Sequence, residues 1–186
     1  MSGNIVVTEF ISLDGVIEDP VGMEGSGLGN WTGPFHRGPQ GDEFKMDELL
    51  GASALLFGRK TYDAFASHWP HAKDNFAERM NKLPKYLASH RRDATWTNTT
   101  LIEGDLAAAA RKLKTQIDGD ILVYGSASIV HQLAPLGLID EFRLMIYPTV
   151  LGRGKKMLPD GHAAVFRTEE IRQLGDGIAL ARYRAI

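Results

Sequence analysis

The sequence lacks cysteine, an excess of either charge and any long apolar run, and each absence excludes a class of protein. Without cysteine among its 186 residues, the chain has no disulfides, no thiolate nucleophile and no cysteine-based zinc site. Its 21 Lys and Arg are balanced by 23 Asp and Glu, so no general basic field attracts nucleic acid. No apolar run is long enough to span a membrane, and the first residues contain no signal-peptide pattern. We expect a cytoplasmic protein with neither nucleic acid nor a membrane as partner.

Several familiar catalytic motifs are also missing. There is no GxSxG elbow, which disfavours a serine hydrolase, and no GxGxxG fingerprint, which weakens a Rossmann interpretation. His68 and His71 stand three residues apart around Trp69-Pro70, without a second pair of candidate ligands. We therefore predict no metal site.

The composition that remains is typical of one globular domain, which we assign to residues 1–186. Hydrophobic residues make up 44% and charged residues 24%, enough to build a sizeable core. Strand and helix patterns alternate along most of the chain, and three strand patterns follow one another at its end. This order predicts an α/β fold with a mostly parallel sheet and an antiparallel edge. The three terminal strands, which we expect to form a meander, are 141–150, 165–171 and 178–183.

Two segments share one pattern: a short apolar strand, a turn centred on glycine, and a helix start. The first is Ala54–Tyr62, with Gly58, Arg59, Lys60 and Thr61 in its turn and first helical residues. The second is Ile121–Ile129, in which Gly125, Ser126 and Ala127 are all small. A helix start offers unpaired N–H groups and a positive dipole end, both of which favour phosphate. Neither segment contains an acidic residue to repel it. Together they suggest a dinucleotide held at two points of one sheet, although each turn alone is common in α/β domains.

A segment rich in glycine and proline, from Glu18 to Gly41, interrupts the pattern after the first strand. Long loops without secondary structure tend to be functional, so we expect it to act as an active-site lid. Trp31 within it is either a stacking surface for a planar ring or a lid residue that packs on the core. A helix is predicted from Asp42 to Leu50, and Asp42 in its first turn is the candidate proton-relaying or substrate-orienting carboxylate. The other acids of this helix, Glu48 among them, are expected on a solvated face.

A basic cluster, Ser89-His90-Arg91-Arg92, follows a third strand pattern. Arginine can bind a phosphate dianion through two parallel hydrogen bonds, which suits the ribose 2′-phosphate that distinguishes NADP from NAD. The alternative is a solvated basic loop, since runs of charge usually lie on the surface.

Taken together, these residues resemble the dihydrofolate reductase-like fold family. The resemblance is greatest to the reductase domain of the bifunctional deaminase-reductase of riboflavin biosynthesis, here in a stand-alone form. The matching segments occur in the family's order over about four-fifths of the chain: Ser12–Gly15, Leu56–Tyr62, Tyr124–Ser128 and Leu138–Gly154.

The resemblance implies a three-layer α/β/α fold with a central sheet of about eight strands, and an NADPH-dependent reductase. It implies phosphate contacts at Gly58, Arg59, Lys60 and Thr61, adenosine-phosphate contacts at Ser89 and Arg91, pyrophosphate contacts at Gly125, Ser126 and Ala127, and a nicotinamide side formed by Asp14 and Ile17. Asp42 lies 16 residues before Gly58, where the family's dihydrofolate reductases carry their substrate-binding carboxylate.

The substrate that we expect is a small planar heterocycle of the pyrimidine or pterin type, as in 5-amino-6-(5-phosphoribosylamino)uracil reductase. Dihydrofolate reduction and a non-catalytic NADP-binding role remain alternatives. A homodimer is plausible, because Leu136, Leu138 and Ile139 could leave an apolar surface.

Overall fold

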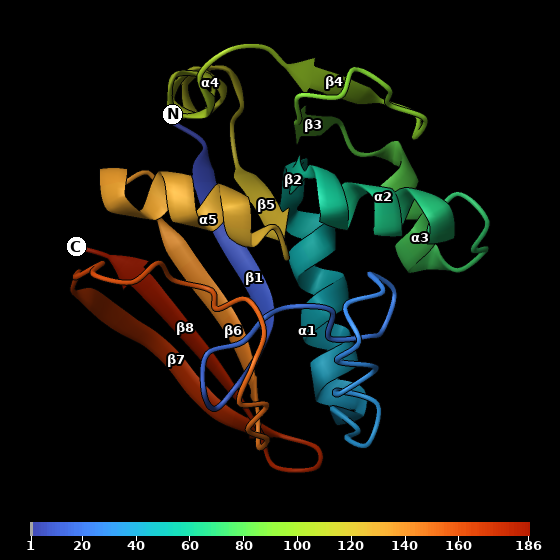
Figure 1. Ribbon diagram of the computed structural model, residues 1–186, viewed down its shortest axis with the longest axis vertical. Coiled ribbons are helices and arrows are strands. Elements are labelled where there is room, and N and C mark those ends of the chain that lie inside the picture. The colour runs from blue at the N-terminus through green and yellow to red at the C-terminus, as the bar shows by residue number, and fades with distance from the viewer. Residues whose placement is uncertain (1) are drawn as a thin grey trace.

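An eight-stranded sheet forms the centre of the protein, for which a computed structural model describes residues 2–186. The strand order is β4-β3-β2-β5-β1-β6-β8-β7. The strands from β4 to β6 pair in parallel, whereas β8 pairs antiparallel with both β6 and β7. The predicted α/β fold with a mostly parallel sheet and an antiparallel C-terminal part is confirmed (Figure 1).

The elements follow one another as the alternating pattern predicts. In chain order they are β1 (Asn4–Ser12), α1 (Gly38–Gly51), β2 (Ala52–Gly58), α2 (Arg59–His68), α3 (Asn75–Lys82), β3 (Lys85–Ala88), β4 (Thr99–Ile102), α4 (Leu106–Gln116), β5 (Asp120–Tyr124), α5 (Ala127–Leu133), the short 3-10 helix η1 (Ala134–Leu136), β6 (Glu141–Tyr147), β7 (Phe166–Leu174) and β8 (Ile178–Ala185).

Helices cover both faces of the sheet and create three apolar cores. α4 and α5 pack on one face, around Ile5, Val7 and Ile121. On the opposite face, α1, α2 and α3 pack around Leu55, Phe57 and Leu122. A third, smaller core lies where the segment before α1 packs against β6 and β8. The sheet is therefore the middle of three layers (Figure 1). Most side chains of β1 and β5 are buried.

The structure differs from two sequence expectations about the elements. α1 begins at Gly38 rather than at Asp42, because Pro39 lies in its first turn, where its fixed φ fits and its missing N–H is not needed. The last three strands are not a meander, because β8 inserts between β6 and the edge strand β7.

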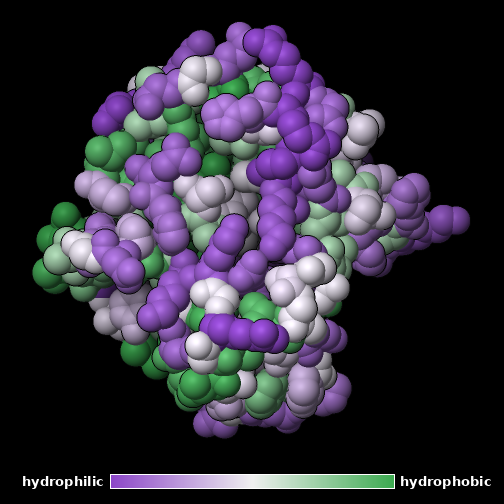
Figure 2. Space-filling model, viewed as in Figure 1, coloured by the Kyte–Doolittle hydropathy of each residue, from purple (hydrophilic) through white to green (hydrophobic). Residues whose placement is uncertain are grey.

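The apolar surface suggested for a dimer is smaller than expected. Leu138 and Ile139 are buried in the core beside α4 and α5, and of the three residues named only Leu136 is exposed. Figure 2 shows one face of the molecule, largely covered by hydrophilic residues, on which hydrophobic residues appear in separate groups. The homodimer remains a prediction.

β1 and β5 are neighbours whose connections leave in opposite directions. The chain runs from β1 through α1 to β2, and from β5 through α5 to β6, so α1 and α5 lie on opposite faces. In open α/β sheets, ligands bind in the crevice that such a reversal creates at the carboxyl ends of the strands. Both glycine-centred turns of the sequence analysis lie at this end of the sheet, after β2 and β5.

Candidate functional site

The two glycine-centred turns, 67 residues apart in the chain, are joined by reciprocal hydrogen bonds. The amide of Gly58 donates to the hydroxyl of Ser126 at 2.9 Å, and the amide of Ser126 donates to the hydroxyl of Thr61 at 3.0 Å. β2 and β5 are adjacent strands, so the turns that follow them meet at one edge. The structure thus brings the two predicted phosphate-binding turns together as one wall.

Glycine is required at the centre of each turn for a steric reason. A Cβ atom on Gly58 would lie 2.9 Å from Ser128 Oγ, and one on Gly125 would lie 2.9 Å from Thr61 Oγ1. Gly125 also has a φ of +54°, and Ser126 beside it has a φ of 58°, a region that side chains with Cβ disfavour. The two glycines therefore allow the turns to pack closely against each other.

A small cavity of about 60 Å³ lies against this wall. Gly58, Lys60, Thr61 and the Gly125–Ser128 turn line one side, and Ile17, Glu18 and Glu24 line the other. The amide of Ile129 is already bonded to the carbonyl of Ser126 at 2.7 Å, so the start of α5 offers the amides of Ala127 and Ser128, and Lys60 adds a cation. These groups suit a phosphate, although the volume is far too small for a dinucleotide while the segment Glu18–Arg37, here called the lid, lies over it.

Two lid carboxylates line the cavity beside Lys60, which the sequence analysis did not foresee. The ammonium of Lys60 lies 3.0 Å from Glu18 Oε1 and 3.5 Å from Glu24 Oε2, and the hydroxyl of Thr61 donates to Glu24 Oε1 at 3.4 Å. Burial raises the pKa of Glu24 above its ordinary value. For Glu18, burial acts in the same direction, but hydrogen bonds from Lys60 and the Lys155 amide outweigh it and lower the pKa. The two turn segments contain no acidic residue of their own, but folding brings two acidic side chains of the lid beside them.

The basic cluster at the carboxyl end of β3 also assembles. The guanidinium of Arg59 donates to Ser89 Oγ at 2.8 Å and to the carbonyl of Arg91 at 2.9 Å. Two aspartates balance the charge: Asp63 lies 3.1 Å from Arg59 and 3.2 Å from Arg91, and Asp93 pairs with Arg91 at 2.5 Å. Arg59 is largely buried and holds the loop, whereas the side chain of Arg91 is 60% exposed. A ligand can therefore reach Arg91, and also its neighbour Arg92, whose side chain is 85% exposed.

The two residues expected on the nicotinamide side lie in different environments. Ile17 is buried and lines the small cavity. Asp14 instead accepts hydrogen bonds from Ser12 Oγ at 2.6 Å and from the amides of Leu151 and Gly152 at 3.1 and 2.8 Å. The Ser12 hydroxyl and these amides lower the pKa of Asp14 to about 2. Asp14 therefore ties the turn after β1 to the loop after β6.

A second, larger cavity of about 460 Å³ lies between the lid and the start of α1. Phe10, Phe35 and Tyr147 give it an aromatic wall, in which Phe10 and Phe35 each meet Tyr147 edge-on. Asp42 lines the rim with a side chain that is 67% exposed, paired with Arg37 at 2.6 Å. An aromatic wall with one carboxylate and one guanidinium at its edge fits a planar heterocycle that carries polar substituents.

Trp31 contributes to the lid rather than to the lining of this cavity. Its indole is 7% exposed, meets Tyr147 edge-on at 5.7 Å and donates from Nε1 to the carbonyl of Glu18 at 2.9 Å. This packing favours the second of the two interpretations given above, in which Trp31 anchors the lid to the core.

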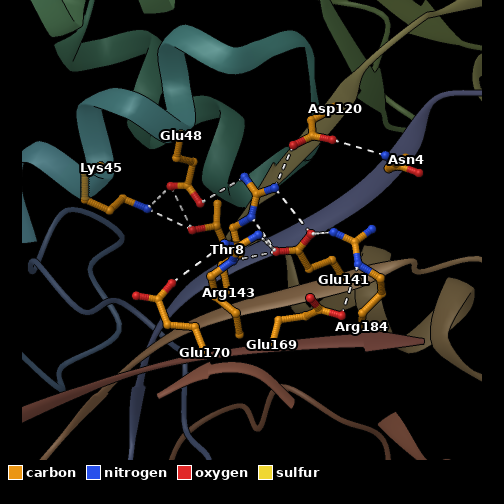
Figure 3. A network of polar contacts seen from close by, with 11 residues as sticks. Asn4, Thr8, Lys45, Glu48, Asp120, Glu141, Arg143, Glu169, Glu170 and Arg184 are labelled. Atoms are coloured by element: carbon orange, nitrogen blue, oxygen red, sulfur yellow. Dashed lines mark hydrogen bonds and ion pairs between the residues drawn. The ribbon is translucent and has the colours of Figure 1, made fainter. Parts of the chain in front are cut away.

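A buried polar network between α1 and the sheet was missed by the sequence analysis. Lys45 Nζ lies 2.5 Å from Glu48 Oε2 and 2.8 Å from Thr8 Oγ1, and Arg143 approaches Glu48 at 3.9 Å (Figure 3). Glu48 was expected on a solvated face, but its side chain is 1% exposed. Glu48 was misplaced because charged residues usually lie on the exposed face of a helix, whereas α1 turns Lys45, Glu48 and Leu49 toward the sheet.

Glu9 is a second buried acid without a sequence prediction. It lies in β1 opposite the start of the Gly125 turn, is 4% exposed, and its Oε1 atom has no hydrogen-bond partner. Burial raises its pKa well above the ordinary value, and the charge of Lys45 and the Gly125 amide oppose that rise only partly. A glutamate within an otherwise apolar strand is the one signal in the sequence that could have drawn attention to it.

The sequence predicts neither a metal site nor a membrane-spanning segment, and residues 2–186 can be searched for both. Within that range, no group of three or more His, Asp or Glu side chains is arranged to hold a metal ion. No helix in the described part of the chain has both the length and the apolar character needed to cross a membrane.

Comparison with known sequences gives a family match over nearly the whole chain. The family described as RibD C-terminal domain matches residues 4–180. The uncharacterized protein YyaP of Bacillus subtilis is 33% identical over 119 residues, which cover 61% of this chain and 63% of YyaP. This match therefore spans less than two thirds of YyaP. The uncharacterized protein YwjB of the same organism is 25% identical over the full length of both chains.

Solved structures show the same fold at low sequence identity. A putative riboflavin biosynthesis protein from Shewanella sp. PV-4 superposes with a TM-score of 0.77 at 18% identity, covering 100% of this chain and 99% of that one. Dihydrofolate reductase from Enterococcus faecalis, in a complex with NADP(H), gives a TM-score of 0.61 at 11% identity, covering 98% and 96%. The dihydrofolate reductase-like fold is thereby confirmed.

Proposed function

Because the chain belongs to the RibD C-terminal domain family, we propose that it is an NADPH-dependent reductase of a pyrimidine- or pterin-type heterocycle. The observation that carries this proposal is the pairing of the Gly58 and Gly125 turns into one glycine-lined wall beside Lys60. The fold agrees with this proposal: the Thermotoga maritima protein described as a deaminase and 5-amino-6-(5-phosphoribosylamino)uracil reductase superposes with a TM-score of 0.65 at 14% identity, over 100% of this chain and 57% of that one.

The residues present fit a dinucleotide extended along the carboxyl ends of β5, β2 and β3. Lys60 and Thr61 would hold one phosphate, and the backbone of Gly125, Ser126 and Ala127 would hold the pyrophosphate. Ser89 and Arg91 would bind the adenosine phosphate, with Arg59 fixing their loop. When bound, the nicotinamide would supply a hydride to the substrate ring. The chain itself binds, orients and shields the two partners.

The larger cavity is the proposed substrate site. Phe10 and Tyr147 would contact the ring, and Asp42 would orient a donor edge of the ring or relay the proton that accompanies the hydride. The lid would exclude water during transfer. Asp42 is exposed and already paired with Arg37, so a substrate that binds it must share or replace that ion pair.

A turnover assay tests the proposal. NADPH oxidation would be followed with 5-amino-6-(5-phosphoribosylamino)uracil and with dihydrofolate, using wild type, Asp42→Asn and the matched control Glu43→Gln, which changes the exposed neighbouring acid. We expect Asp42→Asn to lower kcat/KM by about 100-fold, the scale of losing one acid-base group, and Glu43→Gln to leave it unchanged.

The same assay separates the alternatives. Dihydrofolate reductase activity is a second candidate because Asp42 lines the larger cavity, and it requires turnover of dihydrofolate. Equal rates for Asp42→Asn and wild type would remove Asp42 from the mechanism. Absence of turnover with every heterocycle, despite NADPH binding, would favour the non-catalytic alternative.

A further inference from the structure

The two lid carboxylates in the small cavity occupy the position that the proposed function assigns to a phosphate. Their contacts are specific: each lies within ion-pair distance of Lys60, Glu24 also accepts from Thr61, and Glu18 accepts from the Lys155 amide at 3.0 Å. Their side chains are only 16% and 14% exposed. Carboxylate oxygens here use the same donors that a phosphate oxygen would use.

The loop that carries Glu24 is held in place by a buried aspartate. Asp19 is 1% exposed and accepts hydrogen bonds from the Glu24 amide at 2.7 Å, the Ser26 amide at 3.0 Å and the Ser26 hydroxyl at 2.8 Å. Thr32 fastens the next part of the lid by donating to the carbonyl of Pro20 at 2.8 Å. Glu24 is therefore directed at the cavity by a defined turn.

The charges around the cavity oppose an incoming phosphate while this turn stays in place. Two carboxylates contact a single ammonium, that of Lys60. A phosphate at the same donors would meet like charges at short range, which costs about 1 kcal/mol at 4 Å even in a water-like dielectric. The phosphate cannot share the cavity with both carboxylates, so the carboxylates must move away before a phosphate can bind.

We propose that Glu18 and Glu24 form a carboxylate latch that fills the phosphate site of the free protein and must be displaced for a phosphate-bearing ligand to bind. The inference rests on the proposed function for the identity of the ligand. The backbone carbonyl of Glu18 accepts a hydrogen bond from Trp31 Nε1 at 2.9 Å. Trp31 packs against Tyr147, which lines the larger cavity. A displacement that moves the backbone of Glu18, and not its side chain alone, would therefore also reach the wall of the proposed substrate site.

The latch should respond to pH through Glu24. Lys60 and Thr61 face it from α2, Asp19 and Glu18 from the lid, and Glu9 from β1, and Lys155 lines the same cavity from the loop after β6. Burial raises the pKa of Glu24, and the charge of Asp19 adds to that rise, while Lys60 opposes it. Protonation of Glu24 removes one of the two charges that compete with a phosphate, so the affinity for a phosphate-bearing ligand should increase as the pH is lowered.

The test compares wild type with Glu24→Gln, and uses Glu103→Gln, an exposed acid in the loop between β4 and α4, as the matched control. NADPH binding is measured by calorimetry at two pH values, and amide hydrogen exchange of residues 19–26 is measured without ligand. We expect Glu24→Gln to bind NADPH about fivefold or more tightly, the fold-change that corresponds to about 1 kcal/mol, with a weaker pH dependence. Residues 19–26 should exchange faster in this variant alone.

The two readouts separate failure of the latch from failure of the proposed function. Equal NADPH affinity and equal exchange in all three proteins would overturn the latch. If no protein binds NADPH, hydrogen exchange decides: faster exchange in Glu24→Gln supports the latch and refutes the proposed ligand, whereas unchanged exchange refutes both.

Discussion

Replacing Lys45 with Met should destabilise the protein strongly, because it leaves a buried carboxylate without its counter-ion. Lys45 and Glu48 are 8% and 1% exposed in their side chains and lie 2.5 Å apart. Thr8 Oγ1 accepts from Lys45 at 2.8 Å and donates to Glu48 at 3.0 Å, so one change disturbs three groups. Arg143, at 3.9 Å from Glu48, is too distant to replace the lost hydrogen bond.

The size of the effect follows from the cost of breaking a buried ion pair. Removing one partner typically costs about 3–5 kcal/mol, whereas replacing both by apolar groups is often nearly neutral. For a domain of this length, each kcal/mol shifts Tm by about 2–4 °C. Lys45→Met should therefore lower Tm by roughly 6–20 °C, and Lys45→Met/Glu48→Leu should recover most of the loss.

Urea unfolding of the wild type, both single variants and the double variant provides the measurement. The cycle isolates the coupling between the two side chains. A Lys45→Met variant within about 1 kcal/mol of wild type, or a double variant whose loss equals the sum of the single losses, would refute the reasoning.

Three further predictions concern buried groups and the glycine wall. Burial lowers the pKa of Lys85 to about 8. Between pH 8 and 10.5 the unfolded state therefore binds more protons than the folded state, and the free energy of unfolding should rise by up to about 3 kcal/mol. Urea unfolding should show this rise in wild type and not in Lys85→Met. The raised pKa of Glu9 means that its contribution to stability is present at low pH and lost as the pH rises. Glu9→Gln should therefore unfold at a higher urea concentration than wild type. Its free energy of unfolding should be about 1–3 kcal/mol larger at pH 7, and the difference should be smaller at pH 5. Gly125→Ala should lose about 1–3 kcal/mol of stability, because the φ at this position is +54° and the new Cβ would meet Thr61. Calorimetry should also show weaker NADPH binding by this variant. Unchanged binding would contradict the role of the wall.

Local sequence patterns predicted most of the fold. The two strand-turn-glycine-helix segments became β2–α2 and β5–α5, and the alternation of elements gave the mostly parallel sheet. Asp105, directly before α4, caps that helix by accepting from the Ala108 amide at 2.8 Å. These features depend on residues close together in the chain, where turn chemistry and periodicity decide the structure.

The parts that could not be predicted depend on contacts between distant segments. Glu18 and Lys60 are 42 residues apart and Arg143 and Glu48 are on different elements, so no local pattern indicates that they meet. The order β6-β8-β7 depends on how the last hairpin docks, which strand patterns leave open. The roles of Asp42 and Arg91 remain predictions, because the structure fixes their positions and not their ligands.

The central claim is that the paired turns and the basic cluster bind NADPH, and a calorimetric titration tests it most directly. NADPH and NADH would be titrated into wild type, Arg91→Ala and the control Arg92→Ala, since both arginines are exposed, at 60% and 85%, and neighbours in one loop. The account predicts one site per chain and a preference for NADPH that Arg91→Ala loses and Arg92→Ala keeps. Failure of wild type to bind either cofactor, or an unchanged preference in Arg91→Ala, would contradict it.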